Sequence, residues 1–180
     1  MTTDLQTLSQ RIRASRWGVL LAFLTILFGF GLGGAFGGAE DSLRGGLKAS
    51  GEAVLDSVYG GDTAKLKVVL DKSWTYYKRA HIHGGGIGLA VLATLALLAS
   101  LGRPSARVRG GVSLALGLGA VGYSLFWLLA ARAAPGLGGT DLAKESLTWL
   151  AVPSAGLLLL GLATVTALTV VELFGAPAQG

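Results

Sequence analysis

Four long stretches that contain no Asp, Glu, Lys or Arg constrain this chain more than any other feature. They cover residues 17–39, 80–102, 110–131 and 146–171. A bilayer core about 30 Å thick is crossed by about 20 helical residues, so each stretch is long enough to span it. Lipid offers no hydrogen-bond partner to backbone amides, and the alternation typical of barrel strands is absent. Each stretch is therefore expected to be helical.

The composition supports the same conclusion. Charged residues make up 14% of the 180 residues, against about 25% in ordinary soluble domains. We predict an all-α, integral membrane four-helix bundle that forms a single membrane domain over residues 1–180. Its transmembrane helices are expected at about 17–38, 82–101, 110–131 and 147–171. The absence of cysteine from the sequence excludes disulfides and thiolate metal sites within the chain.

Two arginine clusters predict how the bundle is oriented. One precedes the first apolar stretch and the other lies between the second and third: Arg11, Arg13, Arg16, Arg103, Arg107 and Arg109. The positive-inside rule places both clusters, and with them the N and C termini, in the cytoplasm. Contact with anionic lipid headgroups accounts for this charge, so no nucleic-acid partner is expected. The short loops and the Gly, Ala and Leu content favour a bacterial cytoplasmic (inner) membrane.

The segment at about 39–81, between the first two spans, is predicted to form an extracytoplasmic helical hairpin. Apolar or small residues recur three and four apart on both sides of a Gly-Gly turn at 60–61, and Asp62 follows as a helix-start signal. We expect two antiparallel helices that extend the first two transmembrane helices outward, with Lys48 facing Asp71 across the hairpin. So thin a hairpin is expected to rest on a periplasmic partner or on another copy of the chain.

Glycine accounts for 29 residues and recurs at every fourth position between Gly29 and Gly37 in the first predicted span. Gly84 and Gly88, also four residues apart, lie near the start of the second span. Small residues at this spacing let transmembrane helices approach closely, so the glycines of the two spans are expected to meet, at the depth of residues 33–38. The Gly-rich helix faces also predict contacts with other membrane-protein subunits or with copies in a homo-oligomer.

Both histidines of the chain, His81 and His83, lie where the hairpin is expected to enter the membrane. On a regular helix their side chains point about 200° apart, so they can share one ligand only if the glycines at 84–86 loosen the helix. The hairpin register places Glu40 opposite His81. The predicted metal site combines two imidazoles with two carboxylates, and it suits zinc, copper(II) or iron better than copper(I): His81, His83, Glu40 and Asp41.

Other cofactors fit the same place. A haem would take only one histidine of this chain, since two histidines two residues apart cannot bind opposite faces of the ring. A quinone head would accept a hydrogen bond from His81 and stack on aromatic side chains. The predicted cofactor-binding residues are His81, His83, Trp74 and Tyr77, with Tyr76 beside them. Alternatively, these side chains only anchor the protein among lipid headgroups.

No nucleophile paired with a base is visible in the sequence, so independent catalysis is not expected. We predict a small membrane subunit of a larger bacterial complex, of a respiratory or redox type, with the histidines at a metal, haem or quinone site. One alternative is a structural or assembly membrane protein without a cofactor. Another is a homo-oligomeric channel or small transporter along the glycine seam, although no ionisable residue marks a pathway in mid-membrane.

Overall fold

The computed structural model describes residues 2–175, with side chains from residue 7 onward. These residues form eight helices and no strand: α1 Thr2–Ala14, α2 Arg16–Gly38, α3 Glu40–Glu52, α4 Leu55–Tyr59, α5 Thr63–Ser100, α6 Ala106–Leu137, α7 Thr140–Ser146 and α8 Thr148–Phe174. Four of them, α2, α5, α6 and α8, are long and apolar enough to cross a membrane. The prediction of an all-helical chain with four such helices is confirmed, and it is consistent with a multi-pass membrane protein.

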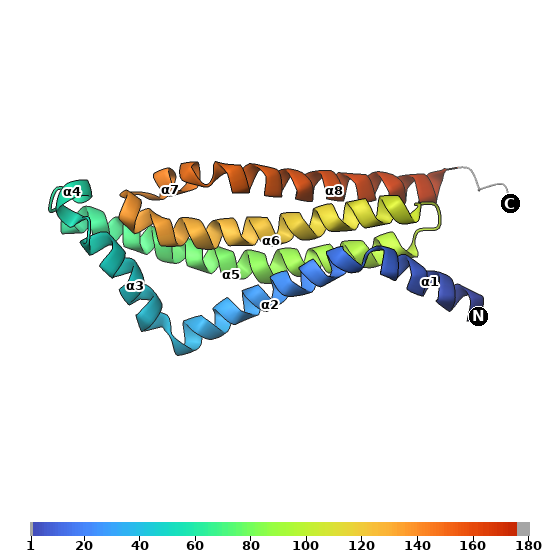
Figure 1. Cartoon of the computed structure of the whole chain (residues 1–180), viewed down its shortest axis with the longest axis horizontal. Helices are drawn as coiled ribbons and strands as arrows, with labels where there is room; N and C mark the ends of the chain where they lie inside the picture. Colours follow the sequence, from blue (N-terminus) through green and yellow to red (C-terminus); the bar gives the residue numbers. More distant parts are fainter. Residues whose placement is uncertain (1, 176–180) are drawn as a thin grey trace.

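Helix α6 lies at the centre of the bundle. It packs against α2 and α5 on one side and against α8 on the other, an order that Figure 1 shows. One apolar cluster surrounds Leu98 and Leu116, and a second surrounds Trp74 and Phe126. Helix α1, the end of α8 and the connection between α5 and α6 lie together at one end of the bundle, whereas α4 and α7 lie at the other (Figure 1).

The end of the bundle that carries α1 is held together by charged side chains. The guanidinium of Arg109, which is 2% exposed, donates hydrogen bonds to the carbonyl oxygens of Leu98 and Leu101 at the end of α5. The carboxylate of Glu172, near the end of α8, accepts a hydrogen bond of 2.8 Å from the backbone N–H of Gly102. Arg109 thus satisfies carbonyl groups that the end of α5 leaves without helical partners, and Glu172 satisfies an N–H group of the connection that follows.

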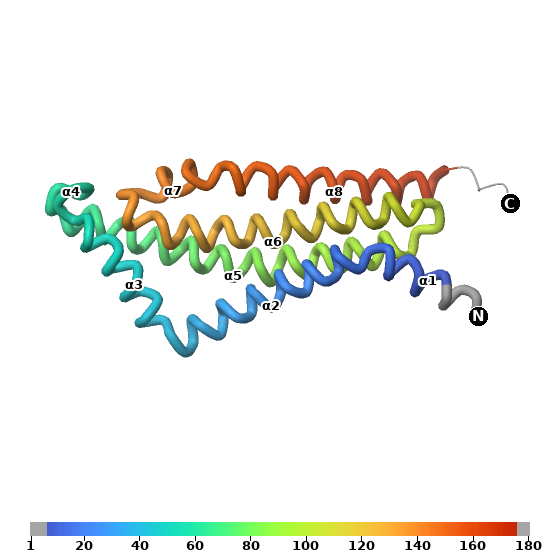
Figure 2. The backbone as a smooth tube through the Cα atoms, in the orientation of Figure 1, coloured from blue at the N-terminus to red at the C-terminus, as the bar shows by residue number. Residues whose placement is uncertain are grey.

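The segment between α2 and α5 corrects the predicted hairpin. Helix α2 ends at Gly38, and Ala39 leaves the helical conformation (φ −142°, ψ 23°). The chain bends sharply there, and α3 returns toward α5 and α6 (Figure 2). The glycines that precede Ala39 have low helix propensity, and the carboxylates of Glu40 and Asp41 favour the start of a new helix. Two helices were expected to extend outward, and α5 alone does so. It is one continuous helix of 38 residues.

The turn before α5 forms as predicted. Gly60 and Gly61 have positive φ angles of 62° and 79°, a backbone conformation that glycine adopts without a steric penalty. The carboxylate of Asp62 then accepts hydrogen bonds from the backbone N–H groups of Ala64 (2.9 Å) and Lys65 (3.0 Å). Asp62 is therefore the N-cap of α5.

The ion pairs across the hairpin were predicted wrongly. Lys48 pairs with Glu52 at 3.5 Å, and Lys67 pairs with Asp71 at 2.8 Å. Each partner lies four residues away on the same helix, a separation at which side chains meet on a helix surface. The oblique course of α3 removes the parallel register on which a Lys48–Asp71 pair depended.

The hairpin rests on helices of its own chain. Helix α3 packs against α5 and α6, and the hydroxyl of Tyr59 in α4 donates a hydrogen bond of 2.7 Å to the carbonyl oxygen of Pro135. This support exists because α6 continues past the predicted span, to Leu137. Helix α6 thus extends six residues past the predicted end of its span at 131, whereas α8 begins at Thr148, one residue from the predicted start.

Candidate functional site

A close approach of α2 and α5 positions the predicted site. A Cβ atom on Gly84 would lie 2.8 Å from the Cα of Gly29, so the two backbones touch. The glycines of the two helices meet as predicted, but Gly84 meets Gly29 rather than a residue in 33–38. Beyond this contact α2 moves away from α5 (Figure 1), and larger side chains fill the space that opens.

His81 occupies the start of this space and faces α2. Its Nδ1 lies 2.7 Å from the carbonyl oxygen of Gly29. Because a carbonyl oxygen only accepts, Nδ1 carries a proton, and in the neutral imidazole Nε2 is the acceptor. The ring lies over Gly33, where a Cβ would come within 2.8 Å of the imidazole Cε1. Metal-binding histidines commonly donate one ring N–H to a carbonyl in this way, although a single nitrogen does not make a metal site.

His83 faces the opposite side of α5. Its ring centroid lies 5.4 Å from that of Tyr123 and 5.8 Å from that of Trp127, both on α6. Helix α5 runs from Thr63 to Ser100 without interruption, so the glycines at 84–86 do not loosen it. The two imidazoles therefore contact different helices, as the spacing of two residues on a regular helix requires.

The carboxylates predicted as metal ligands have other surroundings. Glu40 accepts a hydrogen bond of 2.6 Å from Nε of Arg44, and Asp41 is exposed on α3. Within residues 2–175, no three His, Asp or Glu side chains are grouped so that they could hold a metal ion. The structure thus does not bring the set His81, His83, Glu40 and Asp41 together.

Three of the predicted aromatic and histidine side chains do come together, around Phe36 of α2. The ring centroid of Phe36 lies 5.2 Å from that of Trp74, 6.5 Å from that of Tyr77 and 5.6 Å from that of His81. The guanidinium carbon of Arg44 lies 4.0 Å from the centroid of Trp74, within reach of a cation–π interaction. These side chains fasten α3 and the outer part of α2 onto α5. The sequence analysis did not single out Phe36 as a site residue, although this large side chain interrupts a run of glycines.

A second set of aromatic and cationic side chains holds α5 to α6. Tyr76 meets Trp127 with ring centroids 4.9 Å apart in an edge-to-face contact. The guanidinium carbon of Arg79 lies 4.8 Å from the centroid of Trp127 and 5.2 Å from that of Tyr76. Aromatic pairs and stacked guanidinium groups each stabilise such a contact by about 0.5–1.5 kcal/mol. The predicted anchor residues thus face other helices of the chain.

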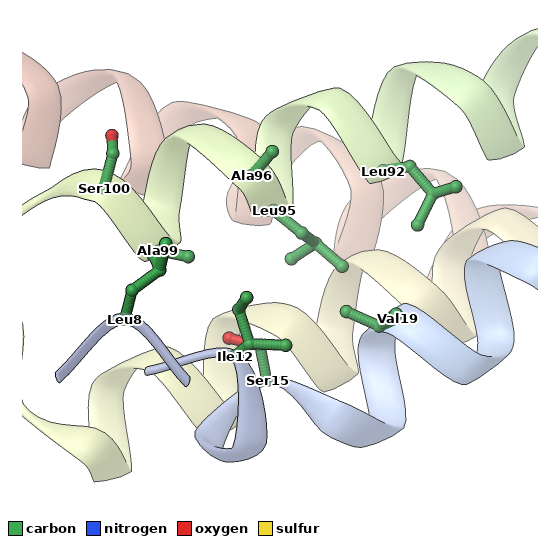
Figure 3. A pocket seen from close by; sticks show the side chains of 9 residues that line it. All are labelled: Leu8, Ile12, Ser15, Val19, Leu92, Leu95, Ala96, Ala99 and Ser100. Atoms are coloured by element: carbon green, nitrogen blue, oxygen red, sulfur yellow. The ribbon is translucent and has the colours of Figure 1, made fainter. Parts of the chain in front are cut away.

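An apolar cleft of about 400 Å³ lies at the opposite end of the bundle, between α1, the start of α2 and the end of α5. Figure 3 shows Leu8, Ile12, Ser15 and Val19 on one side and residues of α5 on the other. The Ser15 hydroxyl is buried and has no hydrogen-bond partner among the described residues. Helix α1 was not predicted, although the spacing of four, three and four residues from Leu8 to Val19 is typical of one helix face.

The structure therefore separates the sequence-predicted site into two clusters, one around Phe36 with His81 and the other around Trp127 with His83. No family model, no curated protein and no solved structure matches this chain. Its function has to be inferred from the arrangement of its own residues.

Proposed function

We propose that this chain is a membrane-embedded subunit of a larger complex and that it binds a transmembrane helix of a partner along one face of α2. Gly31, Gly34 and Gly38 define this face, named here the open glycine face. At each of these residues an added Cβ would meet no described atom within 4 Å. This observation carries the proposal.

The other face of α2 shows why the open glycine face supports a partner. Gly18, Gly29 and Gly33 lie on the bundle side, where a Cβ on each would collide with α5 or α6. These glycines permit close packing within the chain. The open glycine face has no such neighbour, yet glycine is about 1 kcal/mol less favourable than alanine in a helix interior. Small residues on a transmembrane helix are typical of helix–helix contacts.

The residues that precede the open glycine face differ in kind. On the same side of α2, Leu20 and Leu27 are large and 47% and 64% exposed, as expected for side chains that face lipid. The change from leucine to glycine along one helix face favours lipid contact in the first half and a protein contact in the second. The bend at Ala39 keeps α3 away from this surface.

The same proposal includes the orientation and the location. The clusters at Arg11–Arg16 and Arg103–Arg109 lie at the end of the bundle that carries α1, which supports a cytoplasmic position for that end. The open glycine face then lies in the outer half of a bacterial inner membrane. With a cysteine at exposed position 63 or 106, a membrane-impermeant maleimide should label Thr63→Cys in intact cells. It should label Ala106→Cys only after permeabilisation, and the reverse result would contradict this orientation.

The respiratory or redox type of the complex, and a metal, haem or quinone at His81, stay predictions. Metal analysis and a visible spectrum of the protein purified from its native membranes test them. The proposed partner helix does not depend on a cofactor, because the open glycine face lies on the side of α2 away from His81.

Substitution of the open glycine face tests the proposed function. Gly34→Leu and Gly38→Leu place bulk where a partner helix would pack, without displacing any described atom of the chain. Gly156→Leu is the matched control, since a Cβ at Gly156 in α8 also meets nothing within 4 Å. We expect the two α2 variants to leave the complex in a mild detergent while Gly156→Leu stays in it. Equal retention of all three variants would contradict the proposal.

A further inference from the structure

A polar pocket of about 380 Å³ lies between α3, α5 and α6, and neither Glu40 nor Arg44 lines it. Ser42, Gly46 and Ser50 line it from α3, Tyr77 from α5 and Arg132 from α6. The spacing of four residues places the three α3 residues on one helix face. Gly46 has no side chain to fill the space, and a Cβ there would meet no described atom within 4 Å.

The polar side chains of this pocket are all able to donate hydrogen bonds. They are one guanidinium and three hydroxyls, and none of the four side chains makes a hydrogen bond or ion pair with another residue in the described part of the chain. No Asp or Glu lines the pocket. On the same helix, Glu40 pairs with Arg44 and Glu52 pairs with Lys48. A pocket that has donors but no carboxylate favours an anion.

Arg132 and Tyr77 give the pocket its chemistry. Arg132 directly follows the uncharged stretch of α6 at residues 110–131, so its guanidinium lies at the depth of lipid headgroups if α6 spans a bilayer. Tyr77 is 4% exposed, and its ring lies edge-on to that of Phe36, which limits the movement of its side chain beside the pocket. A planar guanidinium binds phosphate through two parallel N–H donors, and hydroxyls supply further donors to the remaining oxygens.

We propose that this pocket binds a phosphate group, the chemistry shared by a phospholipid headgroup and free phosphate. Arg132 pairs with two phosphate oxygens, and the hydroxyls of Tyr77, Ser42 and Ser50 donate to the others. A volume of about 380 Å³ lies within the range of small-molecule pockets, about 300–1,000 Å³, and leaves room for a headgroup substituent. This inference is independent of the partner helix on the open glycine face.

Three probes distinguish the sources of the phosphate. The purified full-length chain in detergent is titrated with dioleoylphosphatidylglycerol, with dioleoylglycerol, which has the same acyl chains and no phosphate, and with inorganic phosphate. Native mass spectrometry measures bound lipid, and equilibrium dialysis measures bound phosphate. Binding of phosphatidylglycerol alone assigns the pocket to a lipid headgroup. Binding of inorganic phosphate, with or without the phospholipid, assigns it to phosphate irrespective of acyl chains.

Matched variants locate the binding. Arg132→Gln should weaken binding about tenfold or more, and Tyr77→Phe, which keeps the ring packed on Phe36, about threefold to tenfold. Lys78→Gln removes the same charge from an exposed position outside the pocket and should leave affinity unchanged. The proposal is overturned if neither phosphate probe binds or if dioleoylglycerol binds equally well. It is also overturned if Lys78→Gln weakens binding as much as Arg132→Gln.

Discussion

At the scale of single residues, Arg109 has a structural role that the charge pattern alone did not predict. It belongs to the arginine cluster that predicts a cytoplasmic loop, yet it is buried and donates to three carbonyl oxygens, those of Leu98, Leu101 and Pro104. Helix α5 would otherwise end with unsatisfied carbonyl groups beneath α6. The sequence does not distinguish Arg109 from its exposed neighbour Arg107, because both occupy the same short basic segment.

Replacement of Arg109 by alanine tests this role. Arg109→Ala should lower the free energy of unfolding by about 2–4 kcal/mol, since it removes three charge-assisted hydrogen bonds and leaves buried carbonyls without partners. Arg107→Ala removes the same charge from an exposed side chain and should change stability by less than about 0.5 kcal/mol. Unfolding of both variants in detergent, followed by circular dichroism, measures the difference. Similar losses for both would show that Arg109 acts only through its charge.

At the scale of elements, the contact of α2 with α5 determines where every other part of the site lies. The two helices touch at Gly29 and Gly84 and then diverge (Figure 1), and the divergence makes room for Phe36 and His81. A regular antiparallel hairpin would have kept the helices in contact beyond this point. The divergence after Gly29 keeps residues 33–38 away from the glycines of α5, and the bend at Ala39 removes the register on which the Lys48–Asp71 pair depended.

Two neighbouring glycines of α5 test this contact. Gly84→Ala should destabilise the bundle by about 1–3 kcal/mol, because its Cβ would lie 2.8 Å from the backbone of Gly29. Gly86→Ala meets nothing within 4 Å and should be neutral or stabilising by up to about 1 kcal/mol, since alanine is the better helix former. Thermal unfolding of the two variants measures the contrast. A destabilisation by Gly86→Ala that equals that of Gly84→Ala would place the helix contact elsewhere.

The start of α5 makes the stability of the hairpin dependent on pH. Hydrogen bonds from the backbone N–H groups of Lys65 and Ala64 lower the pKa of Asp62 below its ordinary value of 3.8. Because the pKa is lower in the folded state, the ionised cap stabilises α5 above about pH 3.8, and this contribution is lost as the pH falls through the folded-state pKa. Asp62→Asn keeps an acceptor but does not titrate.

The two proteins should therefore differ in stability near neutral pH, and the difference should shrink as the pH falls below about 3.8. Hydrogen exchange in the first turn of α5, compared between the wild type and Asp62→Asn at each pH, measures this change. A difference that stays constant with pH would mean that the Asp62 carboxylate is not the titrating group.

At the scale of the whole molecule, hydropathy and charge patterns predicted the four long helices, because they depend only on the run of apolar residues. The Gly-Gly turn and the Asp62 cap were predicted for a similar reason, since turn chemistry is local. The position of α3 was not predicted, because it depends on the outer extension of α6, which is far from α3 in the sequence, and on the packing of Phe36 against α5. The separation of His81 from His83 follows from helix geometry, whereas the pocket around Arg132 requires three helices to be placed first.

The open glycine face is the central claim for the whole molecule, and the lack of cysteine in the chain allows a direct measurement. A single thiol is introduced by Gly34→Cys in the proposed contact, and by Gly156→Cys as the control on α8. Each variant is labelled on its single thiol, in native membranes, with a maleimide that carries a benzophenone. On irradiation the benzophenone forms a bond to a C–H group of a neighbouring chain, and the adducts are resolved by mass. The proposal predicts one adduct of defined mass for Gly34→Cys and none for Gly156→Cys. No adduct for Gly34→Cys, or the same adduct for both, would contradict it.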